Sequence, residues 1–493
     1  MRATDEPLRG SLLSPLAALL SVVMPGAGHM AIGARWRPAV IVAASANALA
    51  MATMAGILWN VHGTADFGDV IADRSTFLFV AMLLLVMAAT RLWAALDSAW
   101  MSRPVAGHRV GMITAGVVVV AVTVLGAVPY AVAAHYVWRT DQAVERVFSS
   151  DDAVTATPGA IATTAPVTTS TVAVSTTAAA STTSTSSTST TSTTVPPFAG
   201  VDRVNVLLLG GDAGPGRYSM RTDSMIVVSI DPESGDTAMI SVPRNLEDLP
   251  FPPGTPLAEE FPKGFENLTN AVYTYADKHR ELAGGGEDAG AQAIKQGIAQ
   301  LLGVPINFYV LVDMAGFVNI VDALGGIDIY VPKRVPTAGN PPRSKHPVPE
   351  YIQKGQQHMD GTLALSYARS READSDYRRM ERQRCVLASI ADAATPQALA
   401  TGLPALMNAF GDAVRSDIPR DELGDLAQLI DRYVDAGGLK AVRTLHLAPP
   451  QIQPSNWDAE EVRQLVVDVL KVPDLGNLEN LPILADACID PGT

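Results

Sequence analysis

The chain has 493 residues, a formal net charge of −14 at pH 7, 48% hydrophobic residues and only two cysteines. Its acidic balance argues against a nucleic-acid partner, because proteins that bind nucleic acids concentrate a basic surface. The length allows more than one domain, and the apolar fraction indicates membrane segments.

Three apolar runs have the length of membrane-spanning helices. They cover Pro38–Val61, Thr76–Leu96 and Gly111–Ala134. Each is close to the roughly 20 residues that a helix needs to cross a bilayer. A fourth run, Leu12–Met24, is shorter and ends at Pro25, so we expect an interfacial or re-entrant helix within residues 1–37 and a three-span module over residues 38–137.

The charges that flank these runs predict their orientation. The loop over residues 62–75 is mostly acidic. Arginines gather before the first run and after the second, at Arg2, Arg9, Arg35, Arg37, Arg103 and Arg109. The positive-inside rule places arginine-rich loops in the cytoplasm, so three spans carry the rest of the chain outside. We expect a multi-pass plasma-membrane protein with an extracytoplasmic C-terminal domain and the lipid bilayer as one partner.

Residues 138–200 contain a tract that is rich in threonine, serine and alanine. From Asp151 to Pro197 it has no aromatic residue and no periodicity, so it cannot build a core. We expect a disordered linker. A polyproline-like chain of about 45 residues would reach on the order of 140 Å, and its hydroxyl groups also permit O-glycosylation.

A globular region follows over residues 201–475, before a C-terminal tail over residues 476–493. Short apolar runs predict strands at VNVLLLG, SMIVVSI, TAMISVP, FYVLVD, IDIYV, ALSYA and TLHLA. Helical patterns cover Leu268–His279, Ala289–Leu302, Met314–Leu324, Arg379–Ala393, Glu422–Asp435 and Ala459–Leu470. This alternation predicts a layered α/β domain with a central sheet.

One glycine-rich loop carries two acids beside two arginines. The segment LLLGGDAGPGRYSMRTDSM presents Asp212, Arg217, Arg221 and Asp223. Two carboxylates suit Mg²⁺, which usually takes one or two protein carboxylates and the phosphate oxygens of a ligand. The alternative is a turn whose acids accept hydrogen bonds from backbone amides.

Arginines also gather in RSREADSDYRRMERQRC, which has six of them and no lysine. A guanidinium grips a phosphate or carboxylate through two parallel hydrogen bonds, which an ammonium cannot do. A helix that begins near Tyr377 would place Arg379, Arg382 and Gln383 on one face. The alternative, a solvated helix of mixed charge, predicts alternating glutamate and lysine, which this segment lacks.

Two further positions extend this pattern, and the cysteines leave a choice open. Arg244 follows a predicted strand, and Asn270 opens a predicted helix, where it would contact either the helix start or a ligand. The histidines show no HExxH spacing, and two cysteines cannot make a four-cysteine zinc site. Outside the cell, Cys385 and Cys488 would form a disulfide or remain as two buried thiols.

Taken together, these segments resemble the LytR-CpsA-Psr family of wall glycopolymer ligases over about Val204–Ala393, and we expect the resemblance to extend to Leu470. The matching pieces are NVLLLGGDAG, RTDSMIVVSIDPESGDTAMISVPRN, LTNAVY, VDMAGFVNIVDALGGIDIYV, DGTLALSYARSR and DYRRMERQR. The resemblance implies an external layered α/β/α domain with a central mixed sheet on a membrane anchor. It also implies a polyprenyl diphosphate-linked glycopolymer as substrate, with its lipid tail in an apolar tunnel.

The resemblance also assigns roles to individual residues. Asp212 and Asp223 are expected to hold Mg²⁺ or Mn²⁺. The diphosphate is expected to bind Arg221, Arg244, Arg369, Arg371, Arg379, Arg382 and Gln383. Arg244, Arg371, Arg379 and Asp376 are the expected catalytic residues. Asn245 departs from the family pattern, which has aspartate there, and several spans replace the usual single anchor.

These residues predict a phosphotransferase. A peptidoglycan hydroxyl would attack the phosphorus attached to the glycopolymer, and polyprenyl phosphate would leave. Asp376 or a metal-binding carboxylate would accept the proton, and water as acceptor would make the site a pyrophosphatase. The alternative is a non-catalytic binder or sensor of lipid-linked wall glycans. A surface stalk would fit the threonine tract but leaves the arginines unexplained.

Overall fold

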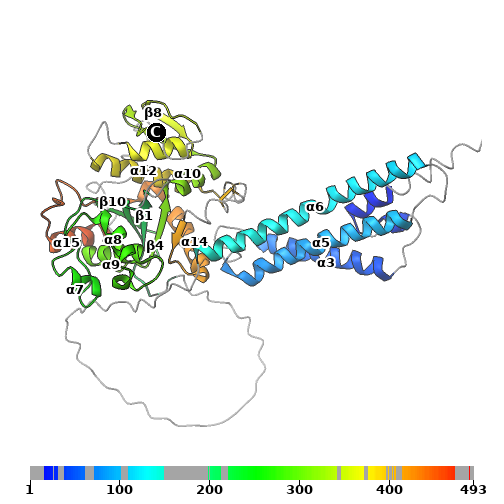
Figure 1. Cartoon of the computed structure of the whole chain (residues 1–493), viewed down its shortest axis with the longest axis horizontal. Helices are drawn as coiled ribbons and strands as arrows, with labels where there is room; N and C mark the ends of the chain where they lie inside the picture. Colours follow the sequence, from blue (N-terminus) through cyan, green and yellow to red (C-terminus); the bar gives the residue numbers. More distant parts are fainter. Residues whose placement is uncertain are drawn as a thin grey trace, which may run out of the picture.

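The computed structural model has two parts, a bundle of helices and an α/β domain (Figure 1). It describes residues 16–25, 27–31, 38–60, 72–101, 109–148, 198, 200–212, 220–340, 346–370, 376–395, 398, 402, 405–406, 414–471 and 488. Residues 149–197 of the expected linker, and all of the expected C-terminal tail except residue 488, therefore lie outside the described residues, whereas residues 138–147 are helical rather than part of a linker.

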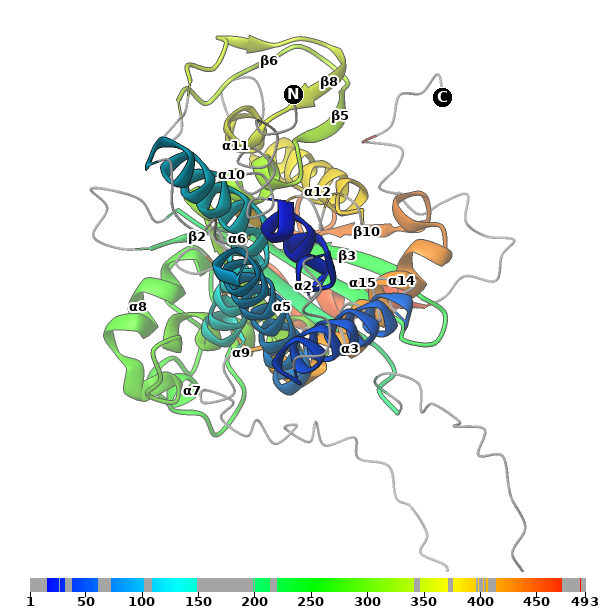
Figure 2. The same cartoon turned by 90° about the vertical axis from the view of Figure 1, so that its right-hand side faces the viewer.

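The bundle consists mainly of three long helices that lie side by side (Figures 1 and 2). They are α3 (Pro38–Asn60), α5 (Arg74–Met101) and α6 (Arg109–Val147). Among the residues described, two segments are long and apolar enough to cross a membrane, Pro38–Ile57 and Arg74–Trp100. The third expected span falls on α6, whose side chains are only partly described, so it stays a prediction.

The shorter apolar run packs inside the bundle. Residues 16–23 are helical, and α2 (Ala27–Ala31) follows after a turn. Ala18 is fully buried against Ala95 and Ala99 of α5. The Arg91 side chain of α5 donates from Nε to the carbonyl of Val22 at 3.1 Å. At about two turns, this helix is too short to span a bilayer.

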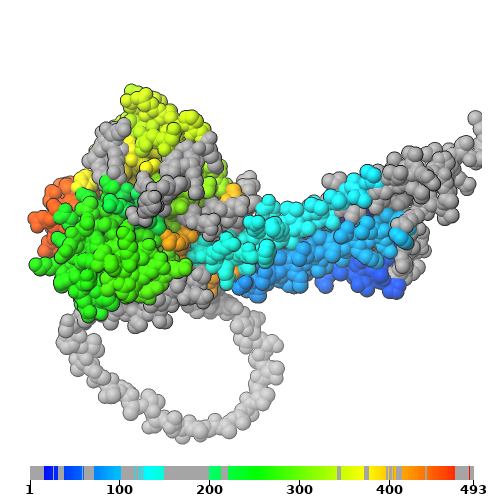
Figure 3. Space-filling model, viewed as in Figure 1, coloured from blue at the N-terminus to red at the C-terminus, as the bar shows by residue number. Residues whose placement is uncertain are grey.

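The far end of α6 docks on the α/β domain. Asp141 is buried, and its Oδ1 lies 2.8 Å from Nη1 of Arg420. Glu145 of the same helix lies 3.1 Å from that guanidinium. In the space-filling view the end of α6, in cyan, meets the domain beside α14 (Leu423–Asp435), in orange (Figure 3). An ion pair with both partners largely buried joins the two parts.

Both ends of the expected linker lie at this junction. Phe148 and Phe198 pack against one apolar cluster that includes Ile418 and Leu429. These two phenylalanines flank residues 149–197, which lie outside the described residues. Both flanks of this segment thus contact one cluster, and the extended tether expected from its composition stays a prediction.

The domain is built on a six-stranded mixed sheet in the order β10-β3-β2-β1-β4-β9. β1 pairs antiparallel with β2 and parallel with β4, while β3 pairs antiparallel with β2 and parallel with β10. The short edge strand β9 is antiparallel to β4. The strands are β1 (Val204–Gly211), β2 (Thr222–Ile230), β3 (Thr237–Ser241), β4 (Phe308–Asp313), β9 (Val414–Ser416) and β10 (Arg443–His446). The expected mixed α/β fold is confirmed.

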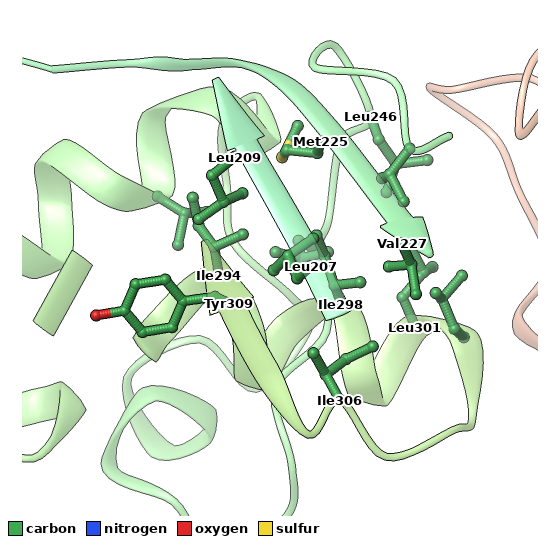
Figure 4. Close-up of a cluster of buried hydrophobic side chains, with 14 of the residues drawn as sticks. Leu207, Leu209, Met225, Val227, Leu246, Ile294, Ile298, Leu301, Ile306 and Tyr309 are labelled. Carbon is green, nitrogen blue, oxygen red and sulfur yellow. The ribbon is translucent and has the colours of Figure 1, made fainter. Parts of the chain in front are cut away.

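Helices cover both faces of this sheet. One face carries α7 (Pro256–Glu260), α8 (Val272–Lys278), α9 (Ala289–Leu302) and α15 (Ala459–Leu470). There Leu207 and Val227 of the strands pack against Ile294 and Ile298 of α9 (Figure 4). On the other face, Ile226 and other strand residues pack against α12 (Asp376–Ala393), and α14 lies beside it.

A smaller layer lies beyond α12. It contains α10 (Met314–Ala323), α11 (Gly361–Arg369) and two two-stranded sheets. These sheets pair β5 (Ile327–Val331) with β8 (Gly355–Met359) and β6 (Val335–Pro336) with β7 (Tyr351–Ile352). The run IDIYV is thus a strand, as expected, but it lies outside the central sheet.

The strand expected at ALSYA is wrong, because this run belongs to α11. The Asp360 carboxylate caps the helix start by accepting from the backbone amide of Leu363 at 2.9 Å. Ala364, Leu365, Tyr367 and Ala368 are all buried. Burial on every side removes the apolar–polar periodicity that normally distinguishes a short helix from a strand.

The two cysteines are joined. A disulfide links Cys385 of α12 to Cys488, across a sequence separation of 103 residues. Of the two alternatives left open by the sequence, the disulfide is the one the structure contains. It ties the end of the chain to the helix that carries the arginine cluster.

Candidate functional site

A cavity of about 660 Å³ lies between the central sheet and the helices α10, α11 and α12. Its charged and polar lining residues, here called the rim, are Asp212, Arg221, Asp223, Arg244, Arg369, Arg379 and Gln383. The remainder is lined largely by apolar side chains, among them Leu208, Val310, Phe317, Leu365, Leu387 and Ile390. The cavity therefore combines this charged rim with an apolar part, here called the interior.

The paired ends of β1 and β2 position the first carboxylate. The Asp212 amide donates to the carbonyl of Arg221 at 3.0 Å, and the Arg221 amide donates back to Asp212 Oδ1 at 2.8 Å. One carboxylate oxygen of Asp212 thus accepts a hydrogen bond from a backbone amide, as the alternative to a metal site predicted. A Cβ added at Gly211 would lie 2.6 Å from the sulfur of Met220, so a larger residue here would displace that flexible side chain.

The second carboxylate lies at the centre of a hydrogen-bonded group. Asp223 Oδ1 accepts from Arg244 Nη1 at 2.9 Å and from Asn270 Nδ2 at 3.1 Å. Burial raises the pKa of Asp223, but the hydrogen bonds from Arg244 and Asn270 and the charges of Arg244 and Arg379 outweigh it and hold this pKa below its usual value. Asp223 is therefore a carboxylate at neutral pH.

Helix α12 supplies two further polar groups. The Arg379 side chain is 2% exposed and donates from Nη2 to the carbonyl of Asp223 at 3.2 Å. One turn later, Gln383 Oε1 accepts from the hydroxyl of Ser224 at 3.1 Å. These two contacts hold α12 against β2. Because Arg379 and Gln383 both contact β2, they lie on one face of the helix, as predicted.

Arg382 differs from the expectation. It is not among the described residues that line the cavity. Instead it is buried behind α11, where Nη2 donates to the carbonyl of Ser370 at 2.6 Å and the guanidinium lies 5.8 Å from the ring centre of Tyr367. The structure places this arginine in a contact between α12 and the end of α11, whereas Arg369 of α11 does line the cavity.

The structure does not describe the side chains of several expected site residues. Arg217 and Arg371 are not described, and Asp376 opens α12 without a described side chain. Their roles stay predictions. Ser224 was missed because the sequence offers no signal for it beyond its place next to Asp223. For Asn270 the sequence left open a contact with the helix start or with a ligand. In the structure its side chain donates to the carboxylate of Asp223.

The two carboxylates fit a hard divalent cation. Mg²⁺ prefers oxygen ligands and usually takes one or two carboxylates, with phosphate oxygens and water completing its octahedron. In the described ranges, no group of three or more His, Cys, Asp and Glu side chains could hold a metal ion. A metal at the rim would thus depend on Asp212, Asp223 and the oxygens of a bound ligand.

Arginines beside an apolar lining form a cavity whose chemistry suits an anionic headgroup with an apolar tail. The chain belongs to the LytR_cpsA_psr family, whose model matches residues 168–457.

Relatives of known function share part of this region. The polyisoprenyl-teichoic acid–peptidoglycan teichoic acid transferase TagU of Bacillus anthracis is 28% identical over 225 residues, which are 45% of this chain and 63% of that protein. The TagU of Halalkalibacterium halodurans is 26% identical over 234 residues, 46% and 64% of the two chains. The matched part thus spans less than two thirds of these relatives.

Solved structures also match the domain at low similarity. The crystal structure of TagV from B. subtilis has a TM-score of 0.40 and 24% identity, covering 54% of this chain and 96% of that one. A structure of TagT bound to LI-WTA has a TM-score of 0.37 and 21% identity, with coverages of 54% and 89%.

Proposed function

We propose that this protein transfers a glycopolymer from a polyprenyl diphosphate carrier to a hydroxyl group of peptidoglycan, while its N-terminal helices anchor it in the plasma membrane. The observation that carries the proposal is a cavity that has both a charged rim and an apolar interior. Such a cavity suits a diphosphate joined to a prenyl chain. The names of the curated relatives support the same class of carrier and acceptor.

The rim arginines bind and orient the diphosphate. Arg244, three residues after the end of β3, and Arg379 of α12 both donate hydrogen bonds to Asp223, and Arg221 and Arg369 line the same cavity. Paired N–H groups suit phosphate oxygens and stabilise the charge that spreads over them in the transition state. Gln383, held by Ser224, adds a polar contact at the same rim.

Asp212 and Asp223 are the residues that would hold Mg²⁺ or Mn²⁺. A bound divalent cation would neutralise phosphate charge. Hydrogen bonds from Arg244 and Asn270 keep the Asp223 side chain ionised and orient it. The apolar interior excludes water from the prenyl side of the diphosphate.

The transfer is a displacement at phosphorus. The acceptor oxygen forms a bond to the phosphorus attached to the glycopolymer, while the bond from that phosphorus to the bridging oxygen breaks and polyprenyl phosphate leaves. The product is a phosphodiester between polymer and wall. The hydroxyl proton goes to a carboxylate, for which Asp376 and the two rim acids are the candidates. Water in place of the hydroxyl would give hydrolysis.

The experiment uses the full chain in lipid nanodiscs with a polyprenyl diphosphate-linked saccharide. Release of polyprenyl phosphate is followed with and without Mg²⁺, beside Arg244→Lys and the matched control Arg280→Lys, an exposed arginine paired with Asp277. The proposal predicts metal-dependent release that falls at least tenfold in Arg244→Lys only. Tight binding without release under any condition, even with a wall acceptor present, would instead identify a non-catalytic binder.

A further inference from the structure

A second, polar cavity of about 330 Å³ lies in the smaller layer, between residues 336–340 and residues 348–351. Its lining includes Thr337, Asn340, Glu350 and Tyr351. No arginine or lysine is among its described lining residues. Figure 2 shows β6 and β8 together at the end of the domain where α11 lies. None of its lining residues is among the rim residues of the large cavity.

One stretch of backbone separates the two cavities. Ala338 lines the large cavity, while its neighbours Thr337 and Gly339 line the small one. The Ser366 hydroxyl of α11 accepts from the Ala338 amide at 3.1 Å and donates to the Gly339 carbonyl at 3.2 Å. The partition is therefore anchored to the helix whose last residue, Arg369, lines the large cavity.

The walls of the small cavity are fixed by internal hydrogen bonds. The Thr337 hydroxyl donates to the carbonyl of Pro349 at 2.7 Å, and Asn340 Oδ1 accepts from the Val348 amide at 2.9 Å. The Arg334 guanidinium lies 3.6 Å from the ring centre of Tyr351, a cation–π contact that orients the ring. A ligand would thus meet a cavity that is already formed.

The chemistry of the small cavity differs from that of the large one. The large cavity gathers arginines, which select anions, whereas Glu350 is the charged residue among the described residues that line the small one. A carboxylate accepts hydrogen bonds from hydroxyl groups and repels phosphates. An oriented tyrosine beside it provides an amphipathic surface with an apolar ring and a polar tip. This combination suits a neutral, hydroxyl-rich saccharide.

We propose that this second cavity binds a saccharide unit of the acceptor polymer next to the diphosphate. The inference rests on the proposed transferase function, because only a transfer requires a second glycan beside the donor. Holding both reactants side by side converts an encounter of two molecules into a step within one complex, which supplies much of the rate enhancement. Glu350 and Tyr351 contact the acceptor, and the 336–340 stretch sets its distance from the rim.

The test separates transfer from hydrolysis in the full chain in nanodiscs. The variants are Glu350→Gln, which keeps the side-chain shape, and Tyr351→Leu. The matched control is Glu259→Gln on α7, an exposed position at the opposite end of the domain from β8 (Figure 1). Transfer to wall saccharide is expected to show an acceptor KM raised about tenfold in both variants. Hydrolysis of the carrier by water, measured without acceptor, is expected to stay within about twofold of the wild-type rate.

A binding measurement keeps the inference independent of turnover. Saturation-transfer NMR with a soluble wall disaccharide is expected to show contact in the wild type and the control, and a loss of contact in both variants. Unchanged saccharide contact in the variants, or transfer and hydrolysis that fall together, would overturn the acceptor site. Absence of any polyprenyl phosphate release from the wild type would instead contradict the proposed function, and saccharide binding would still report on this cavity.

Discussion

Arg244 Nη1 donates to Asp223 Oδ1 at 2.9 Å, and the side chains of both residues remain about one quarter exposed, at 24% and 28%. An arginine proposed for the diphosphate and an acid proposed for the metal are therefore joined by a hydrogen bond. The carboxylate orients the guanidinium at the rim, and the guanidinium keeps the carboxylate ionised. Changes to either residue are expected to affect both ligands.

Asn270 is expected to matter because it is the second donor to Asp223. Replacement by alanine removes a hydrogen bond to a charged group, which typically contributes about 1.5–3 kcal/mol. We expect Asn270→Ala to reduce the rate of polyprenyl phosphate release by at least tenfold. Asn267→Ala, three residues away at an exposed position, is the control and is expected to retain the wild-type rate. Equal rates in both variants would contradict a role for Asn270.

His446 is expected to make the domain less stable in mild acid. Burial, together with the charges of Arg384 and Arg378, lowers the pKa of His446 to about 3. His446 binds a proton near pH 6.5 in the unfolded chain but remains neutral in the folded chain. The free energy of unfolding therefore falls as the pH drops from about 6.5 towards 3. At pH 5 this loss is about 2 kcal/mol.

The check compares wild type and His446→Gln by chemical unfolding at pH 7.5 and pH 5. The variant lacks this titration, so its stability is expected to change less between the two pH values. His279→Gln, at an exposed position, serves as the control and should keep the wild-type difference. An identical pH response in wild type and His446→Gln would show that His446 is not held neutral.

The disulfide is expected to stabilise the domain by constraining the unfolded chain. Closing a loop of about 100 residues contributes roughly 2–5 kcal/mol. We expect a lower melting temperature for the double variant Cys385→Ser, Cys488→Ser. Reductant should lower the melting temperature of the wild type to a similar value and leave the double variant unchanged. If reductant has no effect on the wild type, the bond does not contribute as proposed.

The threonine-rich segment is expected to be dispensable as a spacer. Because Phe148 and Phe198 share one cluster, about ten Gly and Ser residues, with a root-mean-square span of roughly 17–19 Å, should replace residues 151–195. We expect this shortened chain to retain polyprenyl phosphate release in nanodiscs. Loss of activity on shortening would show that the domain must leave the junction in order to work.

The junction itself is expected to be sensitive to charge. Asp141→Arg places two cations together at a largely buried contact with Arg420, which costs several kcal/mol. Protease cleavage near residue 148 should become faster in this variant. The double variant Asp141→Arg, Arg420→Asp should recover part of the protection. Equal cleavage rates in the wild type and Asp141→Arg would mean that the ion pair does not hold the domain on α6.

Local patterns predicted much of the fold. The amphipathic repeat over Ala289–Leu302 and the following Gly303 predict the bounds of α9, because period and stop signal agree. Burial on all sides concealed α11, and the separate pairing of β5 depends on the partner strand β8, which has weak strand character. Composition predicted a linker but cannot show that its two ends meet.

The site was predicted from polar residues at element ends, which gave Asp212, Asp223, Arg244 and Arg379 at one cavity. Helical spacing grouped Arg382 with Arg379 and Gln383, but spacing alone does not show which side of a helix faces a cavity. The tertiary contact with Ser370 decided the direction of Arg382. The small polar cavity depends on pairing between β6 and β7, two-residue strands that no periodic pattern reveals.

The most direct measurement of the central claim is the identity and stoichiometry of the products. The full chain in nanodiscs is incubated with the lipid-linked glycopolymer, Mg²⁺ and wall acceptor, and the products are analysed by mass spectrometry. The account predicts one phosphodiester between polymer and acceptor for each polyprenyl phosphate released, and neither product in Asp223→Asn. Polyprenyl phosphate without the phosphodiester, or equal yields in wild type and variant, would contradict it.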